Sequence, residues 1–302
     1  MPLNPLTEPL GKKRAAHLLR RTCFGASPSE IDSFAELTAQ EAIASLFDNT
    51  LSTPPPPIDP LTGIEWITNG PAENGSEGFE LEGYLNRWMI GQMLATDISE
   101  SQRLAYSFRE RIIFFYHTLF TTKKSEVNNS QAIYYQNALF RIFAFDGEDV
   151  TQANEDPTQP DDICVRNIKK LTEKISVDNA MLVFLDGRLN VEGNPNENYA
   201  RELLELYSIG KGLEGEIPQP EFEGDYFYFT EQDVQEGAKV LGGFDIDRTF
   251  SNIDEETGLP RGVVRGGTIA RAHDNGTKIF SSRLGGASIS PNEDLLFGTS
   301  AT

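Results

Sequence analysis

The residues best suited to chemistry in this chain are its three histidines and the carboxylates that accompany them. The histidines are His17, His117 and His273. A neutral imidazole can act as a base or bind a metal ion, and a carboxylate can orient it or complete a metal site. Mixed nitrogen and oxygen ligands would suit iron, manganese or zinc. Neither a His-Glu-x-x-His nor a Glu-x-x-His pattern is present, so the spacing assigns no metal or cofactor.

Glu110 and His117 lie on one predicted helix, which spans residues 100–120. At 100° per residue, Arg103, Glu110 and His117 fall within about 20° of one another. Most of the remaining helix surface is apolar, which is typical of a buried helix, and buried Glu and His need partners. Two interpretations stay open. The stripe is either an internal network that fixes helix packing, or a site in which His117 is base or ligand and Glu110 its partner.

A second polar helix is predicted to begin at Asn194-Pro195-Asn196-Glu197 and to end at Gly210. Asn194 would cap it, with Glu197 completing a capping box. Its polar face carries Asn198, Arg201, Glu202 and Glu205. This face is either solvated or packed against another polar stripe. We expect Arg201 or Glu202 to be the partner of Glu110 and His117, because those two residues have no other evident partner.

Residues 273–278, His-Asp-Asn-Gly-Thr-Lys, have the composition of a turn in which Gly276 can take a positive φ. The turn either closes a β ribbon or brings His273 and Asp274 into a site. The candidate catalytic residues are therefore His117, Glu110, Arg201, Glu202, Glu205, His273 and Asp274. His17, on a basic helix, is expected to be packed and hydrogen-bonded. No Gly-x-Ser-x-Gly and no phosphate-binding glycine loop is present, which argues against serine hydrolases and nucleotide binding.

The net charge of −20 argues against nucleic acid as a partner, because such binding needs Lys and Arg to neutralise phosphates. An anionic membrane surface would be repelled for the same reason. No apolar stretch approaches the ~18 residues of a membrane span, so we expect no membrane insertion. The first 21 residues lack the apolar core of a signal peptide, and export stays open if the true N-terminus lies upstream. Two cysteines make no disulfide framework, so the compartment is not fixed.

The elements that would position these residues are mainly helices. Ser27-Pro28-Ser29-Glu30 and Thr38-Ala39-Gln40-Glu41 are capping boxes, each predicting a short helix. Further helices are expected over residues 12–21, 79–95, 129–145, 163–175, 179–185 and 231–241. Residues 244–250 and 262–270 could form the strands of a ribbon. The predicted fold is mainly α, a multi-helix orthogonal array with a small β ribbon near the C-terminus.

Three stretches are expected to be loops or insertions, over residues 49–77, 146–162 and 211–228. The first is rich in proline and glycine, and the other two are acidic. Residues 146–162 contain no Lys or Arg. Deleting either acidic stretch should cost little stability, because loop length changes closure entropy only slowly.

Four segments in this order resemble the Domain of Unknown Function 1800 family along nearly the whole chain. They are residues 15–25, 109–117, 194–206 and 273–278. The third segment is long and specific, and Asp233-Val234 and the run from Ala238 to Gly242 fit between the last two. The resemblance implies a mainly helical bacterial protein whose chemistry is not established. This chain departs from it at Leu119, where the family often has a second histidine, and at Asn179, where it tends to have proline.

Members of this family usually continue past the His-Asp segment with more helices. The resemblance therefore implies that residues 1–302 form a single incomplete helical domain. Its partners would be the missing C-terminal helices or another protein. The aromatic-rich helices over 79–95 and 129–145 should then leave apolar surface uncovered and bind hydrophobic dye.

The function predicted from the sequence is that of a non-catalytic assembly or surface-associated protein, because each motif has an adequate structural explanation. The alternative is an enzyme with a carboxylate/histidine site, such as a metal-assisted hydrolase. The two differ in whether His117, Glu110, Glu202, Glu205 and His273 converge on a solvent-reachable pocket.

Overall fold

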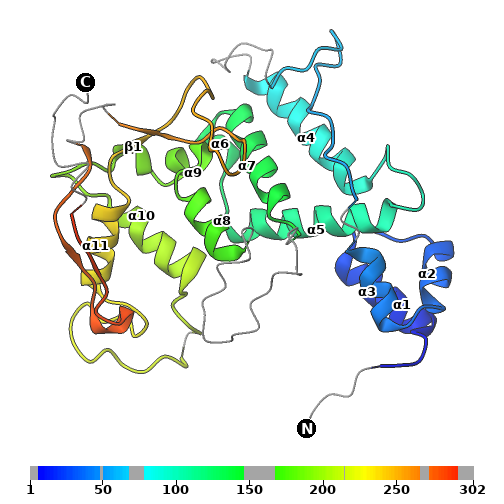
Figure 1. The fold of residues 1–302 in the computed structure, drawn as a ribbon, viewed down its shortest axis with the longest axis horizontal. Coiled ribbons are helices and arrows are strands. Elements are labelled where there is room, and N and C mark those ends of the chain that lie inside the picture. Colours follow the sequence, from blue (N-terminus) through cyan, green and yellow to red (C-terminus); the bar gives the residue numbers. More distant parts are fainter. Residues whose placement is uncertain are drawn as a thin grey trace. The chain divides into compact units, whose positions relative to one another are not determined.

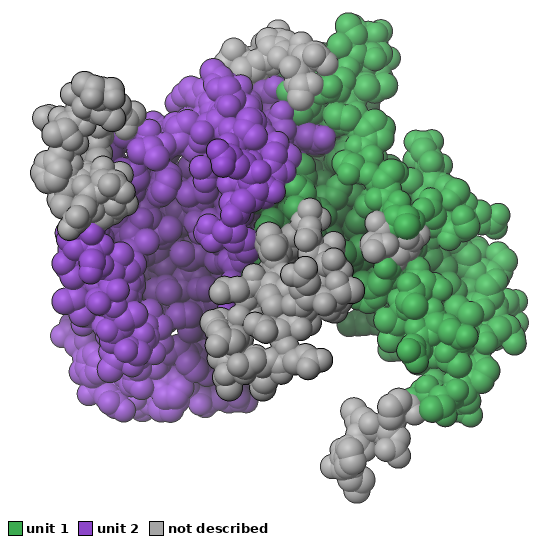
Figure 2. Space-filling view, in the orientation of Figure 1, with its two compact units in different colours: residues 1–118, 137–167 green, residues 119–136, 168–302 purple. Residues whose placement is uncertain are grey.

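The structure is a computed structural model that describes residues 6–47, 50–67, 78–145, 167–213, 215–265 and 272–291. As expected, the fold is mainly α: eleven α-helices and two small two-stranded sheets lie in these ranges (Figure 1). The chain forms two compact units, coloured separately in Figure 2. Unit 1 comprises Met1–Thr118 and Asn137–Asn167, and unit 2 comprises Leu119–Gln136 and Ile168–Thr302.

Unit 1 begins with three short helices whose ends follow from local sequence. They are α1 (Gly11–Thr22), α2 (Pro28–Ala35) and α3 (Ala39–Leu46). Both predicted capping boxes are confirmed, since Ser27 and Thr38 exchange hydrogen bonds with Glu30 and Glu41. The helices enclose a small apolar core formed by Leu10, Ala15, Leu19, Cys23, Phe34, Ala35, Ala42, Leu46 and Leu104.

Two longer helices follow, α4 (Gly78–Leu94) and α5 (Arg103–Leu119). The next long helix, α7 (Ser130–Ile142), contributes to unit 1 from Asn137 onward. Exposure of apolar side chains differs between these helices. Ile90 and Leu94 of α4 are exposed, whereas α7 carries no exposed residue and Phe140 is fully buried. The uncovered apolar patch and the dye binding expected of these helices stay predictions.

Unit 2 contains the short helices α6 (Lys124–Val127), α8 (Ile168–Ile175) and α9 (Asn179–Phe184). A 3₁₀ turn at Gly187–Leu189 leads to α10 (Glu197–Glu202), which continues as a π-helical segment over Leu203–Ser208. Helix α11 (Glu231–Val240) packs against α10 (Figure 1). Gly210 has φ +82°, which confirms it as the glycine that ends the predicted second polar helix.

The β structure consists of two antiparallel two-residue pairs. β1 (Phe244–Asp245) pairs with β2 (Val263–Val264), with Phe244 opposite Val264. This is the expected ribbon, but much shorter than the sequence suggested. β3 (Lys278–Ile279) pairs with β4 (Ser288–Ile289) and contacts α11. This second hairpin was not expected, because the sequence after Ser281 shows no strand pattern.

The predicted cap of the second polar helix is wrong. Asn196, and not Asn194, is the N-cap of α10, and its side chain accepts a hydrogen bond from the Tyr199 amide at 3.2 Å. Asn194 instead forms a β-bridge with Val191. The capping box with Glu197 therefore does not form, because the third residue of a helix capped by Asn196 is Tyr199 and Glu197 is the first.

The predicted loops fall partly within the described residues. Residues 50–67 contain no helix and no paired strand beyond a single bridge between Ile58 and Glu65. Residues 211–228, apart from position 214, also lack helices and strands, although Asp225 is buried. Residues 146–162 lie outside the described residues. None of the helices that the structure describes is long and apolar enough to cross a membrane.

Candidate functional site

Glu110 belongs to the polar stripe of α5, in unit 1. Arg141 of α7 donates hydrogen bonds to both carboxylate oxygens, and the Nη2–Oε2 distance is 3.0 Å. The side chains of Arg141 and Glu110 are only 7% and 4% exposed. The Arg141 guanidinium also lies over the ring of Trp88, 5.8 Å from its centroid. A bidentate pair this well enclosed leaves neither partner open to a ligand.

His117, two helical turns further along α5, joins the same network through Asn137. The Asn137 side-chain amide lies 3.0 Å from Nε2 of His117, and its oxygen accepts a bond from Arg141 at 3.3 Å. Burial, reinforced by the positive charge of Arg141, lowers the pKa of His117 to about 4. The imidazole is therefore neutral near pH 7 and accepts the hydrogen bond at Nε2. The expected Arg–Glu–His network exists, but its arginine is Arg141.

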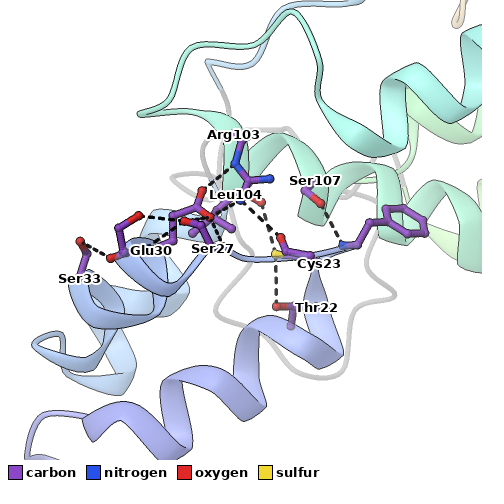
Figure 3. Close-up of polar contacts among 11 residues, drawn as sticks. Thr22, Cys23, Ser27, Glu30, Ser33, Arg103, Leu104 and Ser107 are labelled. Atoms are coloured by element: carbon purple, nitrogen blue, oxygen red, sulfur yellow. Dashed lines mark hydrogen bonds and ion pairs between the residues drawn. The ribbon is translucent and has the colours of Figure 1, made fainter.

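Arg103, at the other end of the stripe, binds Glu30 of α2 (Figure 3). Glu30 also accepts hydrogen bonds from the backbone and hydroxyl of Ser27 at 2.7 and 2.8 Å. Although partial burial opposes it, the hydrogen bonds from Arg103 and Ser27 lower the pKa of Glu30. Ser107 of α5 accepts a bond from the Phe24 amide at 3.0 Å. These contacts fix the first family-like segment onto α5.

In unit 2, Arg201 has a different partner from the one expected. It donates to both carboxylate oxygens of Glu231 at 2.9 and 3.0 Å, at the first residue of α11. The Tyr226 hydroxyl donates to the same carboxylate at 2.6 Å, and the Arg201 guanidinium lies over the Tyr226 ring. Glu110 and Arg201 are therefore each satisfied within their own unit.

The two candidate carboxylates of the second polar helix, Glu202 and Glu205, have different neighbours. Glu205 forms an ion pair with the exposed Lys211 at 3.3 Å. Burial, together with the negative charge of Glu202, raises the pKa of Tyr207 to about 12. Neither contact brings another of the candidate catalytic residues to Glu202 or Glu205.

A cavity of about 200 Å³ in unit 2 is lined by two of the four family-like segments and by the run from Ala238 to Gly242. Its wall includes Pro195 from the third segment, Ala238 and Gly242 from α11 and the turn after it, and Asp274 from the fourth segment. The remaining lining residues are Asn190, Val191, Glu192, Gly193 and Lys239. The charged side chains on the wall are Glu192, Lys239 and Asp274.

Asn190 organises the wall of this cavity and was not singled out from the sequence. Its side chain accepts a hydrogen bond from the Asn196 amide at 2.9 Å and donates to the Ala238 carbonyl at 2.8 Å. Its own carbonyl accepts a bond from the Gly243 amide at 2.8 Å. The residue is only 1% exposed. A lone asparagine between two turns carries no sequence pattern that could have identified this role.

His273 and Asp274 are held at the cavity by close contacts. The His273 ring packs against Gly243, where an added Cβ would approach the ring to 2.5 Å. Partial burial lowers the pKa of His273, so the imidazole is neutral near pH 7. Asp274 accepts a bond from the Gly276 amide at 2.7 Å and pairs with Lys278. Although partial burial opposes them, these contacts lower the pKa of Asp274.

Gly276, which can take a positive φ, does not do so here, and the Asp274 carboxylate closes the turn by accepting a hydrogen bond from the Gly276 amide. One expectation about these segments is wrong. His17 is not packed, since its side chain lies on the exposed face of α1. Among the residues that the structure describes, no group of three His, Cys, Asp or Glu side chains is arranged to hold a metal ion.

The candidate residues are thus distributed between the two units. Glu110 and His117 belong to the network of unit 1, and the other five belong to unit 2. Of those five, Asp274 lines the cavity, whereas Arg201, Glu202 and Glu205 are not among its lining residues.

Comparison with known proteins gives one match. The model of a family described as "Protein of unknown function (DUF1800)" matches residues 17–299. No curated protein and no solved structure matches the chain. The family match spans both units and the motif segments from His17 onward. The chain belongs to the Domain of Unknown Function 1800 family.

Proposed function

We propose that this protein is a non-catalytic assembly or surface-associated protein whose motif residues hold its helices in register. The observation that carries the proposal is the Glu110–Arg141 pair. Both carboxylate oxygens are engaged and both side chains are almost wholly excluded from solvent. A catalytic acid, base or metal ligand needs access to substrate. This pair lacks that access because both side chains are almost wholly buried, so its role is to fix α5 against α7.

The same role extends to the other polar motif residues. Arg103 joins α5 to α2 through Glu30, and Arg201 joins α10 to α11 through Glu231. Asp233 joins α11 to the β3–β4 hairpin through Ser281. In each case the motif residue connects two elements that are distant in sequence.

The proposal is tested by replacing the charged pair with apolar residues of similar size. A source strain that lacks this protein is complemented with the full chain carrying Glu110→Leu and Arg141→Met together. If the pair is structural, the double variant restores the phenotype as wild type does, because apolar residues can substitute for a buried ion pair. A stable double variant that fails to complement would mean that the charges themselves act in function.

The assembly role needs a second measurement on the same strains. Crosslinking in cells that produce the full chain is expected to give a defined complex containing it, and the Leu/Met double variant is expected to give the same complex. A chain that remains uncrosslinked and monomeric in the cell would contradict an assembly role. Lys12→Met with Asp32→Leu is the matched control, because it removes a pair of exposed charges instead.

An enzyme with a carboxylate/histidine site is the second candidate, favoured by the cavity that Asp274 lines beside His273. A neutral imidazole is the form that a general base requires. Under this alternative, His273→Gln abolishes complementation while the folded protein persists, and His17→Gln, at an exposed histidine, does not. Metal analysis of the purified full chain tests whether the site is metal-assisted. Full complementation by His273→Gln would exclude this alternative.

A further inference from the structure

The cavity of unit 2 has charges of opposite sign on separate segments of its wall. Lys239 comes from α11, whereas Asp274 and Glu192 come from two loops that also line the cavity. Lys239 pairs with Glu236 on its own helix at 2.7 Å, and Asp274 pairs with Lys278 in its own turn at 3.4 Å. Lys239 and Asp274 are thus each paired with a neighbour of their own segment.

Lys239 and Asp274 influence one another without touching. The ion pairs of the described residues include none between them. Their charges nevertheless interact: the pKa of Lys239 is raised mainly by Glu236 and also by Asp274, and Lys239 contributes to the lowered pKa of Asp274. Two opposite charges that line one cavity and remain apart leave room for a molecule between them.

The rest of the wall is unsuited to polar recognition by side chains. The Asn190 amide is already engaged on both sides, by Asn196 and by the Ala238 carbonyl. The other lining residues are small or apolar, namely Val191, Gly193, Pro195, Ala238 and Gly242. Recognition therefore depends on the three charged side chains, and the apolar wall can accept a short aliphatic group.

We propose that this cavity binds a small zwitterion of the α-amino-acid type, with its carboxylate on Lys239 and its ammonium group on Asp274 and Glu192. A simple anion would meet two carboxylates, and a simple cation would meet Lys239. Only a ligand that carries both charges satisfies both sides with charge-assisted hydrogen bonds. A cavity of about 200 Å³ suits a molecule of a few carbon atoms. This site goes beyond the structural role proposed above and does not depend on it.

The test is titration calorimetry of the full chain with L-alanine and glycine, compared with acetate and ethylamine, which each carry one of the two charges. We expect saturable binding of the amino acids and at least about tenfold weaker binding of either single-charge probe, because each leaves one charged wall residue unpaired. The amino acids should also raise the melting temperature, since they bind the folded chain.

Variants assign the binding to this cavity. Lys239→Met and Glu192→Gln are each expected to weaken alanine binding about tenfold or more, whereas Lys239→Arg retains it. Lys169→Met, at an exposed lysine of α8, is the matched control and should bind as wild type does. Melting curves without ligand establish that each variant is folded. Absence of amino-acid binding, equal binding of acetate or ethylamine, or unchanged binding by folded Lys239→Met would each overturn the proposal.

Discussion

Arg141 donates hydrogen bonds to both carboxylate oxygens of Glu110, and Asn137 connects this pair to His117. Removing two charges from water costs several kcal/mol per ion, which mutual attraction offsets only when the remaining hydrogen-bonding groups are also satisfied. Here the network satisfies the hydrogen-bonding groups of both side chains. A buried ion pair of this kind adds little net stability compared with two apolar residues in its place. It does make any helix register that separates Glu110 from Arg141 unfavourable.

The stability of the protein is predicted to fall with rising pH because of Asp178. This residue caps α9 by accepting a hydrogen bond from the Met181 amide and another from Gln136, both at 3.0 Å. Burial raises the pKa of Asp178 to about 7. In the unfolded chain the pKa returns to about 3.9, so the stabilising effect of protonation is complete below pH ~4 and is lost as pH rises through ~7.

The variant Asp178→Asn separates this effect from the cap itself. Asparagine keeps the oxygen that accepts the hydrogen bonds and cannot ionise. We expect it to be more stable than wild type at pH 8 by up to about 4 kcal/mol, and similar to it at pH 4, at about 1.4 kcal/mol per pKa unit. Urea unfolding at the two pH values measures this, with Asp97→Asn at an exposed position as the control. An unchanged pH dependence in Asp178→Asn would show that this group does not titrate as described.

Asn196→Ala is predicted to destabilise the protein much more than Asn194→Ala. Besides capping α10, the Asn196 side chain donates to the carbonyl groups of Leu185 and Asp186 at 2.9 and 3.1 Å. Losing the cap and these hydrogen bonds should lower the free energy of unfolding by about 1–3 kcal/mol. A substitution at the surface, such as Asn194→Ala, should change it by no more than ~0.5 kcal/mol. Thermal unfolding compares the two variants. Equal losses of stability, or a larger loss for Asn194→Ala, would show that Asn194 is the N-cap, as the sequence pattern suggested.

The β3–β4 hairpin is predicted to depend on Asp233. This fully buried carboxylate accepts hydrogen bonds from the amide and hydroxyl of Ser281, at 2.7 and 2.6 Å, and from the Thr230 amide. Asp233→Ala should cost about 2–4 kcal/mol and accelerate hydrogen exchange of the Phe280 amide, while Ser281→Ala costs about 1 kcal/mol. Exchange that is unchanged at Phe280 in folded Asp233→Ala would show that the hairpin is held by other contacts.

Gly243→Ala is predicted to displace His273. Gly243 has φ +87°, and an added Cβ would meet the His273 ring at 2.5 Å. Gly258 is the matched control, because it also has a positive φ but has open space around the added Cβ. Both variants carry the backbone strain of about 1 kcal/mol, so a larger loss for Gly243→Ala isolates the contact with His273. Thermal unfolding and the imidazole NMR signals measure this difference between the two variants. Identical behaviour of the two variants would show that the His273 ring does not pack against Gly243.

Features set by a few neighbouring residues were predictable from the sequence. The capping boxes at Ser27 and Thr38 and the positive φ of Gly210 follow from residue types within one helical turn. The mainly α fold and the ribbon near residue 244 follow in the same way from periodicity and glycine positions. These signals are local, so tertiary contacts did not have to be known.

Partners chosen by tertiary packing were not predictable. The polar stripe of α5 indicated that Glu110 needs a partner, but nothing in the spacing selects Arg141, which lies 31 residues away. Asn194 and Asn196 are equally good caps by residue type, and the choice depends on Asn190 binding the Asn196 amide. The cavity wall was missed for the same reason, because Lys239 and Glu192 belong to no pattern of their own.

The most direct test of the structural role of the motif residues is a double-mutant cycle on Glu110 and Arg141 by urea unfolding of the full chain. Each single variant, Glu110→Leu or Arg141→Met, is predicted to lose about 3–5 kcal/mol because it leaves an uncompensated buried charge. The double variant should recover to within about 1–2 kcal/mol of wild type, whereas the exposed Lys12–Asp32 pair should show a coupling below about 1 kcal/mol. Single variants as stable as wild type, or a double variant as unstable as the sum of the two, would contradict the account.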